Sequence, residues 1–397
     1  MTERAFDIVL YGASGFTGQL VAEYLASAHA ELRWAIAGRN QQKLERCRRD
    51  LGTPDLPILI ADSDDADQLK AMALQAKVII STVGPYARHG SLLLETCARE
   101  GTHYCGSTGE AQWMAEVYAK VDPLAKASGA RLVHCCGFDS IPSDLSVYFL
   151  QKEFKERFGR YASRVSGRMG RASGGVSGGT VASLMLVAEQ ASQDPVIRAR
   201  IMDPYALYPG GVSPGSDKPD QTGVAWDDDF GSWTAPFVMA AINTKVVRRS
   251  HALAGLPYGD DFGYDESQLC DSRAKALLSA GGLGTVMAGT FFAPTRALLK
   301  KLLPDPGEGP DESKRENGFF EFWTHGSDGS DHLRVKVTGQ RDPGYGATSR
   351  MLAQAALCLA QDSLAVGGGI WTPASAMGDA LLQRLPGVDI HFKVVED

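Results

Sequence analysis

A glycine-rich segment near the start of the chain is the first candidate for chemistry. Gly12, Gly15 and Gly18 are spaced three residues apart, between a strand-like run at 6–11 and a helical pattern at 20–25. In such a unit the first glycine allows a tight turn, the second lets a pyrophosphate approach backbone N–H groups, and the third permits close helix–strand packing. This order of elements favours a dinucleotide site over a purely structural turn. The predicted cofactor-binding residues here are Gly12, Ala13, Ser14, Gly15, Phe16, Thr17 and Gly18.

Basic and polar residues follow the next predicted strand, at residues 32–37. NAD sites usually place an acidic residue here, which binds the ribose 2′-hydroxyl. This chain has Arg39, Asn40 and Lys43 instead. Because a guanidinium can hold phosphate oxygens with two parallel donors, these three residues predict a site for the 2′-phosphate of NADPH. The alternative is a surface arginine at the start of a helix.

An alternation of strands and helices over the first 140 residues must position these groups. The expected strands are 6–11, 32–37, 57–61, 78–83, 102–105 and 131–135, and the expected helices include 65–74, 91–99 and 111–127. Apolar strands joined by helices predict a parallel, doubly wound sheet of the Rossmann type, in an α/β protein.

Ligands of such sheets lie at the carboxyl ends of the strands. This rule places Asp62 near the adenine, and Val83, Gly84 and Pro85 along the cofactor. It also places His103, Tyr104 and residues 135–140 around the nicotinamide.

Three polar side chains near these strand ends are the predicted catalytic residues. Tyr86, His103 and Tyr104 could each donate a hydrogen bond or a proton to a substrate carbonyl. The alternative for each is a packed residue with a satisfied polar tip. Asp139 and Ser140 are expected instead to cap the helix that starts near Pro142.

Composition excludes several classes of function. The formal net charge of −7, from 40 basic and 47 acidic residues, argues against a nucleic-acid partner. The seven cysteines form no CxxC pair, which predicts reduced thiols, no metal site and a cytoplasmic location. Residues 280–294 are apolar but too short, and too rich in glycine, for a transmembrane helix.

The second half of the chain has the pattern of a mixed α+β domain. Strands are expected at 164–171, 319–325 and 332–339, and helices after Pro142, at 343–361 and from Pro373. We therefore predict an NADP-binding domain at 1–140, an α+β substrate or dimerisation domain at 141–366, and a C-terminal segment at 367–397 that joins the two.

Residues 280–303 combine a glycine-broken apolar half with a basic amphipathic half. Packing within the second domain is the expected state. Peripheral contact with an anionic membrane, or the wall of a lipid tunnel, is the alternative. A homodimer is also left open.

Several motifs resemble those of the saccharopine dehydrogenase-like oxidoreductases, nearly from end to end. They are Gly12–Gly18, Ala37–Arg39, Ser81–Tyr86, Gly101–Tyr104 and Thr108–Glu110. Two others, Gly137–Asp144 and Gly367–Gly378, are similar to the branch that contains trans-acting enoyl reductases. The resemblance implies an NADP-binding Rossmann domain, a second α+β domain and, for bacterial members, work beside polyketide synthases in lipid and glycolipid synthesis. One departure is Cys105-Gly106-Ser107, where family members often carry Asp.

The resulting prediction is an NADPH-dependent oxidoreductase that reduces an enoyl thioester, either a small molecule or a lipid on an acyl carrier. A short-chain reductase using Tyr148 and Lys152 is one alternative, although Cys135 stands where its catalytic serine is usually found. An NADPH-binding, lipid-associated sensor or scaffold without catalysis is another. A saccharopine-type amino-acid dehydrogenase is the third, but no cationic pocket for a dicarboxylate can be assigned.

Overall fold

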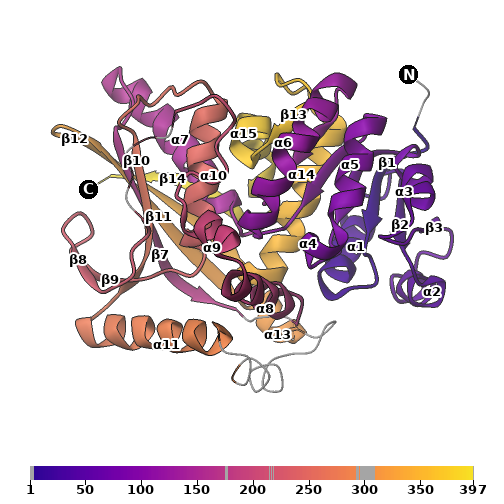
Figure 1. Cartoon of the computed structure of the whole chain (residues 1–397), viewed down its shortest axis with the longest axis horizontal. Helices are drawn as coiled ribbons and strands as arrows, with labels where there is room; N and C mark the ends of the chain where they lie inside the picture. Colours follow the sequence, from indigo (N-terminus) through magenta and orange to yellow (C-terminus); the bar gives the residue numbers. More distant parts are fainter. Residues whose placement is uncertain are drawn as a thin grey trace.

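The first of two sheets contains seven parallel strands in the order β13-β6-β5-β4-β1-β2-β3 (Figure 1, right). The computed structural model describes residues 4–396, except 175–177, 214, 216, 218, 292–294 and 296–308. The strands are β1 (Phe6–Tyr11), β2 (Trp34–Gly38), β3 (Ile58–Ile60), β4 (Ala76–Ser81), β5 (His103–Gly106), β6 (Arg131–Val133) and β13 (Gly369–Trp371). The strand order reverses between β1 and β4, which is where doubly wound sheets bind their ligands. The predicted α/β fold class is confirmed.

Helices from the first third of the chain connect these strands. They are α1 (Phe16–Ala28), α2 (Gln41–Asp50), α3 (Ala66–Ala73), α4 (Tyr86–His89), α5 (Ser91–Glu100) and α6 (Ala111–Ser128). The glycines Gly101 and Gly129 end α5 and α6 in left-handed conformation, which glycine adopts without steric cost. Helices α3, α5 and α6 pack together on one face of the sheet.

The other face of the first sheet is covered by α1 and by a helix from much later in the chain. This helix, α14 (Thr348–Gln361), follows the π-helical turn Pro343–Ala347 and packs on β1, β4 and β5. The sequence prediction placed 343–361 with the second domain, whereas α14 packs on strands of the first sheet. The helix is apolar around most of its circumference because it lies between the two halves of the molecule, so its pattern does not indicate which sheet it covers.

The second sheet is mixed, with the order β14-β12-β11-β7-β10-β9-β8 (Figure 1, left). Its strands are β7 (Arg164–Ser173), β8 (Ala225–Asp227), β9 (Ser232–Ala235), β10 (Gly263–Cys270), β11 (Phe319–Asp328), β12 (Asp331–Gln340) and β14 (Ile390–Val395). The expected hairpin is β11 and β12, which pair antiparallel along their whole lengths. The C-terminal segment contributes β13 to the first sheet and β14 to the second.

The remaining helices surround the second sheet and the junction. They are α7 (Ile141–Phe158), α8 (Gly178–Gln193), α9 (Pro195–Met202), α10 (Ala240–Leu253), α11 (Arg273–Phe291), α13 (Glu312–Glu316), α15 (Pro373–Arg384) and the 3-10 turn Leu385–Val388. One hydrophobic core runs from β1 and β4 through α14 and α15 to Phe320 and Phe322 of β11. The two sheets are therefore joined by shared packing.

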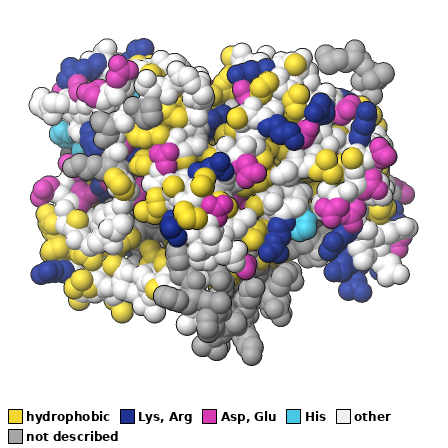
Figure 2. Space-filling model, in the orientation of Figure 1, with side chains coloured by type: hydrophobic (Ala, Val, Ile, Leu, Met, Phe, Trp, Pro, Cys, Tyr) yellow, Lys and Arg dark blue, Asp and Glu magenta, His cyan; other side chains and the backbone are white. Residues whose placement is uncertain are grey.

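The segment 280–303 is only partly described. Its first half belongs to α11, which packs on β9 and β10 and against α8, while 296–303 lies outside the described residues. Leu277, Leu278 and Val286 of α11 are exposed. Figure 2 shows hydrophobic side chains at the lower left of the surface, where Figure 1 places α11. No described helix has both the length and the apolar character that crossing a membrane requires. Membrane contact through this segment stays a prediction.

Candidate functional site

The glycine loop joins β1 to α1 at the carboxyl edge of the first sheet. Gly12 has a φ of +93°, and a Cβ there would lie 2.7 Å from Thr82 Oγ1 and 2.8 Å from Val83 Cγ2. A Cβ on Gly18 would collide with the Gly12 carbonyl. Two of the glycines are therefore required for the reasons that the sequence suggested.

The amino end of α1 can accept an anion. Its N-cap, Gly15, has no side chain to cap the helix, and the first turn carries no acidic residue. First-turn N–H groups are thus left for a pyrophosphate, which the positive end of the helix dipole also favours. The Gly15 N–H itself is used within the loop, because it donates to the Gly12 carbonyl at 3.0 Å.

A substitution at Gly12 tests this loop. Gly12→Ala forces a side chain into a positive-φ position and against Thr82, so we expect a loss of about 1–3 kcal/mol in unfolding free energy and weaker NADPH binding. Gly129→Ala is the matched control, since Gly129 has a φ of +84° with nothing within 4 Å of its Cβ position. Calorimetry should show destabilisation in both variants. Unchanged NADPH affinity in Gly12→Ala would contradict the loop assignment.

The residues predicted for the adenosine end lie after β2 and β3. Arg39 and Lys43 are exposed at the start of α2, while Asn40 serves as its N-cap, with Oδ1 accepting from the Lys43 N–H at 3.0 Å. Asp62 starts the turn before α3 and accepts from the Asp64 N–H. Burial and the negative charge of Asp62 raise the pKa of Tyr11 to about 12, although the positive charge of Arg39 acts to lower it. The charges of Arg39 and Asp62 therefore both act on Tyr11, at the carboxyl end of β1.

A buried carboxylate that the sequence prediction missed fixes the segment after β4. Glu110 accepts from the N–H groups of Tyr86 and Ala87, at 2.9 Å each, and from Ser183 Oγ of α8 at 2.9 Å. It thereby holds the Val83-Gly84-Pro85 turn beside the glycine loop and ties it to the second half of the molecule. The only signal in the sequence was its place in the Thr108–Glu110 motif.

The three predicted catalytic residues do not form a cluster at this edge. The Tyr86 hydroxyl is buried and donates to the Ser81 carbonyl at 2.8 Å, and Tyr104 lies wholly within the core. His103 pairs with Val78 at the amino end of β5, and its Nδ1 accepts from the Arg131 N–H. Burial lowers the pKa of His103 to about 4. The expected placement of His103 is wrong, because it opens its strand and the cofactor edge lies at the strand's other end.

The loop after β6 presents an acid at the cofactor edge. Its backbone is anchored by the Phe138 N–H, which donates to Thr348 Oγ1 of α14 at 3.0 Å, and by the Phe138 ring against Phe320. The next residue, Asp139, is partly exposed and approaches Gly109 of the neighbouring strand end. It was expected to cap α7, but the N-cap is Ser140, whose side chain makes no cap hydrogen bond.

The second sheet brings another carboxyl group toward Asp139. Glu266 of β10 is fully buried and accepts from the Tyr264 hydroxyl at 2.7 Å and from Asn243 Nδ2 at 2.9 Å. Burial, with a smaller contribution from the charge of Glu266, raises the pKa of Asp139 to about 7. Burial also raises the pKa of Glu266 to about 7. Two carboxyl groups, one in the loop after β6 and one on β10 of the second sheet, thus have pKa values raised well above the usual range.

Comparison with known proteins follows the whole length of the chain. The protein named "Putative trans-acting enoyl reductase Rv2449c", from Mycobacterium tuberculosis (strain ATCC 25618 / H37Rv), is 41% identical, covering 99% of this chain and 98% of that protein. A trans-acting enoyl reductase of Mycobacterium bovis (strain BCG / Pasteur 1173P2) is 38% identical, covering 98% and 97%. The chain belongs to the saccharopine dehydrogenase-like family, in the branch of the trans-acting enoyl reductases.

Residues 8–133 match the saccharopine dehydrogenase NADP-binding domain. The predicted cofactor, NADP(H), and the assignment as an oxidoreductase are therefore confirmed. The fold of the chain is similar to that of apo saccharopine dehydrogenase (L-Glu forming) from Saccharomyces cerevisiae, with a TM-score of 0.54 at 13% identity. The match covers 98% of this chain and 100% of the yeast chain.

The short-chain reductase alternative is not supported by the position of its two residues. Tyr148 and Lys152 line a pocket between α7, α10 and α15. No described residue of the cofactor loop contributes to that pocket. Lys152 forms an ion pair with Asp379 at 2.9 Å instead.

The glycine-rich stretch at 174–180 is only partly described. Residues 175–177 are outside the described part, and α8 begins at Gly178. The described portion of α8 reaches the edge through Ser183, which bonds Glu110.

Proposed function

We propose that this oxidoreductase uses NADPH to reduce the carbon–carbon double bond of an enoyl thioester, carried on an acyl carrier during lipid or glycolipid biosynthesis. The observation that carries the proposal is Asp139, a partly exposed acid with a raised pKa at the cofactor edge of the sheet. The names of the full-length relatives support the choice of substrate class.

Enoyl reduction adds a hydride to the β-carbon and a proton to the α-carbon of the thioester. When bound, NADPH supplies the hydride. Asp139 is the proposed proton donor, since a carboxyl group with a pKa of about 7 is partly protonated at neutral pH. After donating its proton to the α-carbon, it can take another from solvent because its side chain is not sealed off.

Glu266 is a positioning residue in this scheme. Its hydrogen bonds to Tyr264 and Asn243 hold the carboxyl group in place, and its charge disfavours ionisation of Asp139. Glu110 is a second positioning residue, which fixes the turn after β4 without facing the reacting atoms.

A saccharopine-type amino-acid substrate fits the second half of the molecule less well. Three buried arginines could recognise a dicarboxylate, but each is engaged internally. Arg168 pairs with Asp227 and Asp265, and Arg248 pairs with Asp217. Arg249 donates to two backbone carbonyls.

The direct test is NADPH oxidation by the purified chain with trans-2-enoyl thioesters. We expect absorbance of NADPH to fall with the enoyl substrate and to stay constant with the saturated thioester of the same length. Binding of NADPH without oxidation by any enoyl thioester would favour the sensor alternative and overturn the proposal.

The pH dependence of kcat tests whether Glu266 influences the pKa of Asp139. Because Asp139 must be protonated to donate, kcat is expected to fall as pH rises through about 7. Glu266→Gln removes a negative charge that raises the pKa of Asp139, so this fall should move to lower pH. The surface variant Glu95→Gln serves as the control, with an unchanged profile. A profile that does not move in Glu266→Gln, or that moves to higher pH, would refute the coupling.

A further inference from the structure

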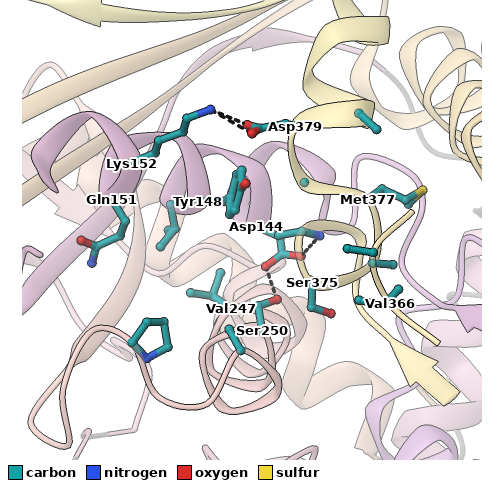
Figure 3. A pocket seen from close by; sticks show the side chains of 18 of the residues that line it. Asp144, Tyr148, Gln151, Lys152, Val247, Ser250, Val366, Ser375, Met377 and Asp379 are labelled. Atoms are coloured by element: carbon teal, nitrogen blue, oxygen red, sulfur yellow. Dashed lines mark hydrogen bonds and ion pairs between the residues drawn. The ribbon is translucent and has the colours of Figure 1, made fainter. Parts of the chain in front are cut away.

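A second cavity lies between α7, α10 and α15, apart from the cofactor loop (Figure 3). Its volume is about 660 Å³, which is within the range of about 300–1,000 Å³ common for small-molecule sites. The neighbouring loop at 363–366 completes its wall. Nothing in the proposed reduction uses this space.

The larger part of the cavity's lining is apolar. Val247 of α10, Met377 of α15 and Val366 of the neighbouring loop line it (Figure 3), and Val147 of α7 also belongs to its lining. Such walls match an unbranched hydrocarbon chain, whose transfer from water is favourable by about 0.8 kcal/mol per buried CH₂.

Most ionisable groups at the cavity already form hydrogen bonds or ion pairs with other groups of the protein. Asp144 is buried in the wall, and its two carboxyl oxygens accept from Ser250 Oγ and from the Ala374 N–H. At the rim, Lys152 is paired with Asp379. Asp144 is thus engaged by donors of the protein itself, and the positive charge of Lys152 is balanced.

Lys155 is the exception among the described lining residues. Its ammonium group contacts the Tyr161 hydroxyl at 3.1 Å and lies 4.6 Å from the centre of that ring, and the described ion pairs do not include it. The rim therefore carries one exposed cation without a carboxylate, next to an apolar hollow.

We propose that this pocket binds an amphipathic anion, with a single hydrocarbon chain along the apolar wall and a carboxylate or phosphate head at Lys155. The site is separate from the enoyl-reducing site and does not depend on its assignment. A fatty acid and an alkyl phosphate share this chemistry, and the head groups can be compared directly.

The test is calorimetric titration of the full chain, saturated with NADPH, using ten-carbon probes below their micelle concentrations. We expect saturable binding of decanoate or decyl phosphate, and the tighter of the two identifies the natural head group. Decanol should bind more weakly, and decylamine weakest. Binding of decylamine as tight as that of both anions would overturn the proposal.

Variants locate the site. Ala254→Trp, at an exposed lining position, and Ala380→Trp should each fill the cavity and abolish binding, with NADPH affinity unchanged. Lys155→Met should weaken the anions about two- to fivefold, as expected for an exposed charge pair, whereas Lys120→Met outside the pocket should not. Undiminished anion binding in a folded Trp variant, or in Lys155→Met, would show that the ligand lies elsewhere.

Discussion

Asp139→Asn is expected to lower kcat for enoyl reduction by about 10²–10⁴-fold, the usual contribution of a general acid. Asparagine matches aspartate in size but holds no titratable proton. Because the anchors of the loop are the Phe138 N–H and ring, the backbone should keep its position. Steady-state rates at pH 6 to 7, together with NADPH titration, measure the effect.

The control for this prediction is Asp379→Asn, which removes an exposed carboxylate that pairs with Lys152. Its kcat should stay within about twofold of the parent chain. A normal kcat in Asp139→Asn would exclude Asp139 as the proton donor. An equal loss of NADPH affinity would assign it to cofactor binding instead.

Arg39→Asp is expected to weaken NADPH binding by about 10–100-fold while NADH binding changes little. A charge-assisted hydrogen bond to the 2′-phosphate is worth about 1.5–3 kcal/mol, and an aspartate would also repel the phosphate. Aspartate can instead accept from the 2′-hydroxyl of NADH. Fluorescence titration with both cofactors gives the two dissociation constants.

Arg46→Asp provides the same change of charge on the exposed surface of the same helix, α2, but away from its first turn. It should alter NADPH affinity less than about twofold. If Arg39→Asp weakened both cofactors equally, or neither, Arg39 would be an ordinary surface arginine, and recognition of the phosphate would have to come from another residue.

The cofactor loop could be predicted from the sequence because its determinants are local. Strand β1, the loop and α1 occupy residues 6–28 without interruption, and the positive φ of Gly12 and the tight packing of Gly18 are properties of that unit. The strands that follow were located to within a few residues for the same reason, since each has its own apolar pattern.

The acid pair could not be predicted, because it is assembled from distant parts of the chain. Glu266 lies on β10, in the polar run GYDESQLC, and only pairing with β7 places it in the interior. Asp139 lies in a loop whose position depends on α14, more than 200 residues later. The packing of α14 on the first sheet could not be predicted either, because it also joins parts of the chain that are distant in the sequence.

The misplacement of His103 has a simpler cause. Strand β5 starts at His103 and ends at Gly106. A polar residue next to a predicted strand can lie at its amino or its carboxyl end, and the sequence pattern alone does not say which. Only the register with β4, in which His103 faces Val78 and Gly106 faces Ser81, shows which end meets the cofactor.

In the proposed reaction, hydride passes from NADPH to the β-carbon of an enoyl thioester. The most direct measurement uses NADPH carrying deuterium at the transferred position, with product analysis by mass spectrometry and NMR. We predict a saturated thioester with a single deuterium at the β-carbon. Deuterium at the carbonyl carbon, or a product without deuterium, would contradict the account.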